Sequence, residues 1–199
     1  MSPATAAPHS PQVVFDGLVA SVSRAVLRDE LQVTTIPAPT GLAPFSYALA
    51  ADVNPARHDD DSDLGSGRLI ILYDPEATEG WGGAVRIICY AQAPLETEIG
   101  LDPFVADVAW SWLVDALAAR GARYTSASGT ATKVLSTGYG ELAAQGSGAQ
   151  IELRASWTPL EFDLETHVEG WAELLCMVAG YPPLADGVAV LQPRRGSRV

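Results

Sequence analysis

Positive charge is scarce in this chain of 199 residues. It has 12 lysines and arginines against 24 aspartates and glutamates, so its formal net charge at pH 7 is −12. This excess of negative charge repels phosphate backbones and releases no counterions from them, which argues against nucleic acid as a direct ligand. The apolar runs are far shorter than the roughly 20 residues that a membrane-spanning helix needs. We therefore expect neither nucleic acid nor membrane among its partners.

Cysteine and histidine are also scarce. Cys89 and Cys176 each lie inside an apolar run, which is typical of buried cysteines that act as small apolar side chains. His167 falls in the first turn of an expected helix, where we expect it to face solvent. We find no nucleophile elbow, phosphate-binding loop or zinc-ligand spacing. We expect no catalytic residue, no metal and no cofactor, and the absence of a charged and then apolar leader predicts a cytoplasmic protein.

Hydrophobic residues make up 48% of the chain, which is enough for one sizeable core at this length. The first ten residues are rich in proline and small side chains and lack apolar periodicity, so they predict a disordered tail over 1–10. We expect one domain over 11–184 and a C-terminal tail over 185–199. The acidic stretch from Asn54 to Ser66 predicts a loop into solvent, because its like charges repel one another.

The spacing of apolar residues predicts the order of the elements. Spacings of three and four predict helices from Val14 to Leu27, from Phe104 to Leu117 and from about Asp163 to Gly180. Short alternating or β-branched runs predict strands over 31–36, 44–53, 68–73, 81–92, 131–136 and 149–157. Four successive strands favour antiparallel pairing. The predicted fold is α+β, a mostly antiparallel sheet of about six strands with three helices on one face, in the order α-ββββ-α-ββ-α.

The last predicted helix carries two patterns near its start. Thr166 and Glu169 have the spacing of a capping box, which predicts the helix N-terminus there. Glu165, Glu169 and Glu173 lie four residues apart, and such a row is typical of a solvated helix face. The opposite stripe of the same helix includes Trp171, whose ring we expect in the core.

Tryptophan is frequent, with five in the chain. Trp112 falls on the apolar stripe of the central helix, so we expect it to be buried. Trp110 lies two residues earlier, and a rotation of about 200° means that both rings cannot face the same core. We expect Trp110 to be more exposed or held in an interface, as a candidate anchor for a partner.

Five stretches carry a resemblance to a known family over most of the chain, from about Phe15 to Pro183. They are LAPFSYALAADV, DVAWSWLVDAL, SASGTATKV, ELRASWTPL and WAELLCMVAGYPP. The chain resembles an actinobacterial family catalogued as domain of unknown function 3000, which implies a bacterial cytosolic protein and supplies no catalytic residue. The element order is also similar to secretion-chaperone-like folds, which act as protein-binding dimers, although this chain has one strand more before its central helix.

Two functions from different classes fit these observations. The first is a non-enzymatic protein-interaction module, which binds a protein partner or itself as a possible homodimer, with Trp110 as the interaction residue. The alternative is a small-molecule enzyme or ligand-binding protein whose site for an anionic ligand is formed by Arg86, Arg154 and Tyr139 with a carboxylate. Convergence of Arg86 and Arg154 in one concave pocket distinguishes the second function from the first.

Overall fold

A computed structural model of the chain describes residues 10–53, 64–76 and 79–183. Apart from Ser10, the tails expected over 1–10 and 185–199 lie outside the described residues. The acidic loop expected from Asn54 to Ser66 also lies outside them over 54–63.

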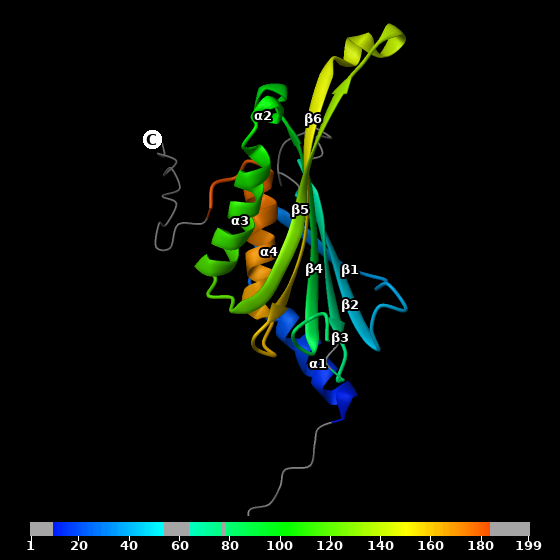
Figure 1. Ribbon diagram of the computed structural model, residues 1–199, viewed down its shortest axis with the longest axis vertical. Helices are drawn as coiled ribbons and strands as arrows, with labels where there is room; N and C mark the ends of the chain where they lie inside the picture. Colours follow the sequence, from blue (N-terminus) through cyan, green and yellow to red (C-terminus); the bar gives the residue numbers. More distant parts are fainter. Residues whose placement is uncertain (1–9, 54–63, 77–78, 184–199) are drawn as a thin grey trace, which may run out of the picture.

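The strands form one antiparallel sheet in the order β1-β2-β3-β4-β6-β5. Figure 1 shows α2, α3 and α4 on one side of this sheet. The strands are β1 Leu31–Ile36, β2 Phe45–Val53, β3 Ser66–Tyr73, β4 Val85–Leu95, β5 Tyr124–Thr137 and β6 Ser147–Pro159. The helices among the described residues are α1 Pro11–Val22, α2 Thr97–Leu101, α3 Val105–Ala119 and α4 Glu165–Val178, with a 3-10 turn, η1, at Gly140–Gln145. The predicted α+β class and the six-stranded antiparallel sheet are confirmed. The short α2 is an addition that the apolar spacing did not indicate.

The two faces of the sheet differ sharply. Along β4 the burial alternates, and Val85, Ile87, Cys89, Ala91 and Ala93 are buried on the face that carries the helices. This alternation follows from the period of two in a strand. The buried face packs against α3 and α4. None of these helices covers the opposite face, which is called the open face below.

Helix α4 packs on β3 and β4 beside α3, which packs on β5 and β6, and most of the residues of α4 are buried. Trp171 is fully buried within it, as the sequence predicts. The predicted capping box at Thr166 is wrong, because α4 begins at Glu165 and its N-cap residue Leu164 has no side-chain cap. The hydroxyl of Ser21 on α1 instead accepts a hydrogen bond of 2.9 Å from the Leu164 N–H. The Asp163 carboxylate accepts a hydrogen bond of 3.1 Å from the Glu165 N–H, so a local contact and a contact with α1 both hold the start of α4.

Several element boundaries differ from the prediction. Helix α1 ends at Val22, five residues before the predicted end, and Val26 is 74% exposed. Strands β5 and β6 are longer than predicted and extend past the rest of the sheet as a two-stranded arm with η1 at its tip (Figure 1). Within the described part of the chain, none of the helices is long and apolar enough to cross a membrane.

Candidate functional site

The three residues predicted for an anion site do not come together. Arg86 and Arg154 both lie on the open face, but Arg154 is in register with Tyr90, four residues along β4 from Arg86. Four residues of a strand span about 13 Å. Tyr139 lies at the tip of the β5–β6 arm and is 80% exposed. The structure therefore separates the predicted set into three places.

Arg154 lines a trough in the open face. Its Nη2 lies 3.1 Å from the Glu152 carboxylate, and its guanidinium lies 5.6 Å from the centroid of the Tyr90 ring. The trough has a volume of about 730 Å³, and its lining includes Asp52 and Arg68. The charge of Arg154 is thus already paired within the open face.

Arg86 has a different environment, because its hydrogen-bond partners among the described residues are all neutral oxygens. Its Nη1 donates to the Ser126 carbonyl at 2.9 Å and to Thr158 Oγ1 at 3.0 Å. Its Nη2 donates to Ser156 Oγ at 2.7 Å and to Ser128 Oγ at 3.3 Å. None of the ion pairs formed by the described residues includes Arg86. Burial lowers the pKa of Arg86 from its ordinary value, because the charged guanidinium loses part of its contact with water.

The partners of Arg86 lie beside an irregularity of β5. The β5–β6 register shifts between Thr125 and Ser128, which marks a bulge. Within it, Ser126 has φ of 52°, the one positive value for a non-glycine residue in the described part of the chain. A loop packs closely on this bulge, since a Cβ atom at Gly82 would lie 3.1 Å from Ser126 Oγ. Arg86 therefore joins β4 to the bulge.

Strand β5 forms an edge of the sheet, with β6 as its neighbour on one side. None of its 14 residues is buried. Edge strands present a row of unpaired backbone N–H and C=O groups, which can pair with another strand. We call this unpaired side of β5 the β5 edge.

Trp110 lies against β5 from the helix side. A Cβ atom at Gly129 would come within 2.7 Å of its Cζ3, so the ring sits directly over the Gly129 backbone. Trp110 is half-buried and contacts the core. The missing side chain at Gly129 is what permits this contact between α3 and the edge strand.

Trp112 is half-buried, so the prediction that it would be buried is wrong. It lines a small surface hollow with Met177 and Tyr181, on the side of α3 that faces the end of α4. The rotation of about 200° between the two rings holds. However, the core-facing stripe of α3, which includes Ala109 and Leu113, lies between them, so each ring flanks the core.

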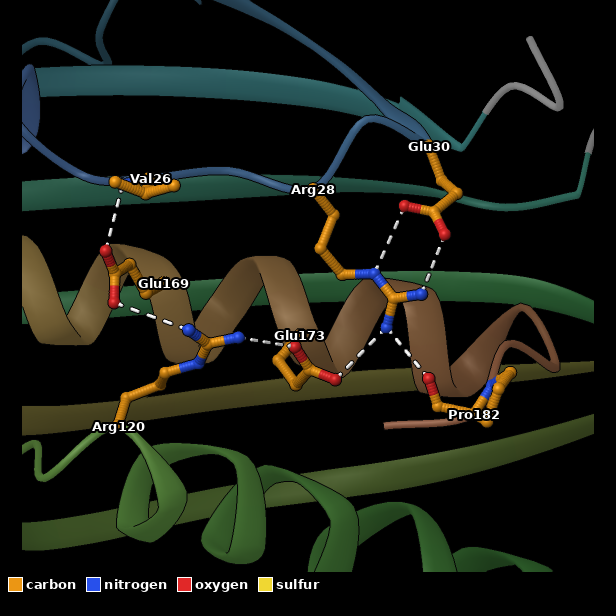
Figure 2. A network of polar contacts seen from close by, with 7 residues as sticks. All are labelled: Val26, Arg28, Glu30, Arg120, Glu169, Glu173 and Pro182. Atoms are coloured by element: carbon orange, nitrogen blue, oxygen red, sulfur yellow. Dashed lines mark hydrogen bonds and ion pairs between the residues drawn. The ribbon is translucent and has the colours of Figure 1, made fainter. Parts of the chain in front are cut away.

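A buried network of ion pairs corrects the prediction of a solvated carboxylate row on α4 (Figure 2). The Glu173 side chain is only 4% exposed and accepts from Arg28 at 3.1 Å and from Arg120 at 2.8 Å. Arg28 is 5% exposed and also pairs with Glu30 at 2.8 Å. The hydrogen bond from Arg28 lowers the pKa of the Glu30 carboxyl. Glu173 therefore joins the segment after α1 to α3.

A second carboxylate of α4 extends this network. Glu169 accepts from the Val26 backbone N–H at 2.9 Å and lies 3.7 Å from Arg120 Nη1. Arg28 Nη1 also donates to the Pro182 carbonyl at 2.9 Å, which ties down the chain after α4 (Figure 2). Every charged side chain labelled in Figure 2 has an oppositely charged partner, so this network of ion pairs supports the fold rather than a ligand.

His167 is buried and not solvent-facing, which corrects a second prediction for α4. Its Nδ1 accepts a hydrogen bond of 3.1 Å from Trp157 Nε1 on β6. Burial lowers the pKa of His167 to about 4, against opposing effects of Glu161 and the Arg123 backbone. The imidazole is therefore neutral at pH 7 and acts as an acceptor inside the core.

Both cysteines are buried free thiols, as predicted. Burial raises the pKa of Cys89 and of Cys176 to about 12, so both thiols stay protonated at neutral pH. Among the described residues, no cluster of three histidine, cysteine or acidic side chains is arranged to hold a metal ion.

Comparison with known proteins identifies one family. Residues 11–189 match the model of a family described as "Protein of unknown function (DUF3000)". No curated protein and no solved structure matches the chain.

Proposed function

The chain belongs to the DUF3000 family of proteins of unknown function, and we propose that it is a non-enzymatic interaction module that binds a second copy of itself along the β5 edge. The observation that carries this proposal is the exposed edge strand with the Trp110 ring beside it. The expected dimer continues the sheet from one copy into the other.

The composition of β5 supports pairing with itself. Lys133 is the only charged residue among its 14, in a chain whose formal net charge is −12. Two acidic copies therefore meet here without opposing carboxylates. Val134 and Leu135 on the same strand are 40% and 50% exposed. Pairing removes apolar surface from water and satisfies the unpaired backbone groups of both edges.

The position of Trp110 favours twofold symmetry. Gly129, which lies under the ring, is close to the midpoint of β5. An antiparallel pair of identical strands has its twofold axis between them, and an axis perpendicular to the sheet keeps the helices of both copies on the same side. Two Trp110 rings then meet near the axis. Large aromatic rings at the centre of an interface are typical binding hot spots.

Sedimentation with two neighbouring proline variants tests this proposal. Adjacent residues of a strand direct their N–H groups to opposite sides. One of the two variants, Thr130→Pro and Ala131→Pro, therefore loses a hydrogen bond to β6. The other variant loses only an N–H group that points out from the β5 edge. The melting temperature distinguishes them, because the first variant loses stability. We expect the stable variant to sediment as a monomer and the wild type as a dimer.

Two tryptophan variants provide the matched comparison. Trp110→Ala should weaken self-association about thirtyfold or more, as for loss of a hot spot worth about 2 kcal/mol. Trp112→Ala removes an equally large, half-buried ring from the other flank of α3 and should leave the dimer intact. A wild-type protein that sediments as a monomer at about 0.1 mM overturns the proposal, since specific dimers associate well below that concentration.

The two free buried thiols support the cytoplasm as the compartment of this module, because cytoplasmic thiols stay reduced.

The second candidate function, binding of an anion, is favoured at Arg86 alone among the three residues that the sequence singled out. Arg154 is paired with Glu152, and Tyr139 lies on the distant arm.

A further inference from the structure

We propose that Arg86, Ser128 and Ser156 form a binding site for a phosphate group on the open face of the sheet. The site goes beyond self-association, because it lies on the face opposite to Trp110 and uses different side chains. It requires only part of the anion site that the sequence suggested, since neither Arg154 nor Tyr139 contributes.

The charge of Arg86 is the first argument. A guanidinium stays protonated at neutral pH, and a half-buried one is usually paired with a carboxylate. The four oxygens around Arg86 belong to three hydroxyls and one carbonyl, all neutral. The local positive charge is therefore uncompensated within the described structure, and a bound anion would supply the missing partner.

The hydroxyls provide the second argument. Arg86 has only donors, so Ser128 and Ser156 accept from it and keep their own protons. Their two oxygens lie 3.4 Å apart, which lets one hydroxyl donate to the other and leaves at least one proton for a ligand. Ser128 is exposed and Ser156 half-buried, so both can be reached from the open face. A phosphate oxygen can take the place of a serine hydroxyl as acceptor while that hydroxyl turns to donate.

The residues around Arg86 hold its guanidinium in place. Thr158 is buried, accepts from Arg86 and donates to the Trp81 carbonyl. A Cβ atom at Gly83 would lie 2.7 Å from Thr158 Cγ2, so the loop packs tightly behind the threonine. Thr158 thus holds the guanidinium in position before a ligand arrives, which reduces the entropic cost of binding.

A titration with inorganic phosphate, followed by the backbone amide signals of Ser126, Ser128 and Ser156 in nuclear magnetic resonance, tests this proposal. We expect saturable shifts at these residues in the wild-type protein at constant ionic strength. Sodium chloride should produce no saturable shift, and sodium acetate should bind at least tenfold more weakly. Acetate that binds as tightly as phosphate overturns the assignment to a phosphate group.

Three variants separate the site from general electrostatics. Arg86→Gln should abolish saturable binding. Because this change can also disturb the bulge, Ser128→Ala tests the site with Arg86 in place and should weaken phosphate binding about tenfold. Arg154→Gln removes an arginine from the same face and should leave the affinity unchanged. Equal losses for Arg86→Gln and Arg154→Gln overturn the proposal. Phosphate binding by a protein that sediments as a monomer would support this site while refuting self-association.

Discussion

At the scale of single residues, Glu173 is the acidic residue whose ion pairs connect α4 to α3 and to the segment after α1. Its buried carboxylate pairs with Arg28 and Arg120, which come from different segments of the chain. Removal of one partner from a buried pair costs about 3–5 kcal/mol when it leaves a charge uncompensated, but here Arg28 keeps Glu30 and Arg120 keeps Glu169. We therefore predict that Glu173→Gln lowers the free energy of unfolding, measured by urea denaturation, by about 3 kcal/mol, the lower end of that range.

The matched control is Glu161, which pairs with Arg123 at 2.8 Å while both side chains are more than half exposed. Exposed pairs contribute less than about 1 kcal/mol, because water and salt screen them. Glu161→Gln should therefore change the stability only slightly. Equal losses for both variants would contradict the structural role of Glu173.

His167 predicts a dependence of stability on pH. Its pKa is about 4 in the folded protein and 6.5 when solvated, so the unfolded chain binds the proton more tightly. The stabilising effect is fully present above pH 6.5 and is lost as the pH falls from 6.5 to 4, by about 3 kcal/mol in total. Urea denaturation at a series of pH values between 7 and 5 should show this decline. In His167→Gln the decline should be much smaller, and an unchanged slope would contradict the assignment.

These two residues also show the limit of sequence patterns. Spacing places Glu173 and His167 on helical faces, but it does not reveal what packs against each face. Helix α4 contacts the sheet, α3 and the segment after α1, so polar residues on several sides are buried. The basic partners of Glu173 lie 53 and 145 residues away, and no local signal connects them.

At the scale of elements, Gly67 sets the distance between α4 and the sheet. A Cβ atom there would lie 2.4 Å from Leu175 Cδ2 on α4 and 2.8 Å from the Tyr90 carbonyl on β4. The backbone carbonyl cannot easily move, so we predict that Gly67→Ala lowers the free energy of unfolding by about 1–3 kcal/mol, as overpacking does.

Gly148 on β6 is the matched glycine for this test, since no atom lies within 4 Å of its added Cβ. Gly148→Ala should leave the stability unchanged or raise it slightly, because the unfolded chain loses conformational freedom. Thermal melts of the two variants measure the difference. Similar melting temperatures would show that α4 does not pack on β3 as closely as described.

Most elements were predictable from the sequence, and their ends were less so. The bounds of β1 match the prediction, because its run of apolar and β-branched residues ends at Pro37. Strand β5 begins at Tyr124, seven residues before the predicted start, since its serine, glycine and threonine residues carry no apolar alternation. Helix α1 ends early at Val22, and the carboxylate of Glu169, on a distant helix, binds the Val26 backbone N–H.

At the scale of the whole molecule, the described residues leave the open face of the sheet and the β5 edge available to ligands. The helices cover the other face and enclose the core. Trp110 and Arg86 were both singled out from sequence, but the features that give them meaning depend on the fold. The β5 edge next to Trp110 and the hydroxyls around Arg86 arise only when β5 and β6 pair.

The most direct test of self-association is a cysteine scan along β5 in the oxidised protein. Both native cysteines are buried, so an introduced thiol is the reactive one. In a twofold antiparallel pair only one residue faces itself across the axis, so disulfide formation should peak at one position. Among Ser128→Cys, Thr130→Cys, Thr132→Cys and Val134→Cys, we predict the highest yield of covalent dimer at Thr130 or Thr132. Thr34→Cys on the opposite edge, β1, should give almost none. Equal yields at all five positions, or no covalent dimer from β5, would contradict the account.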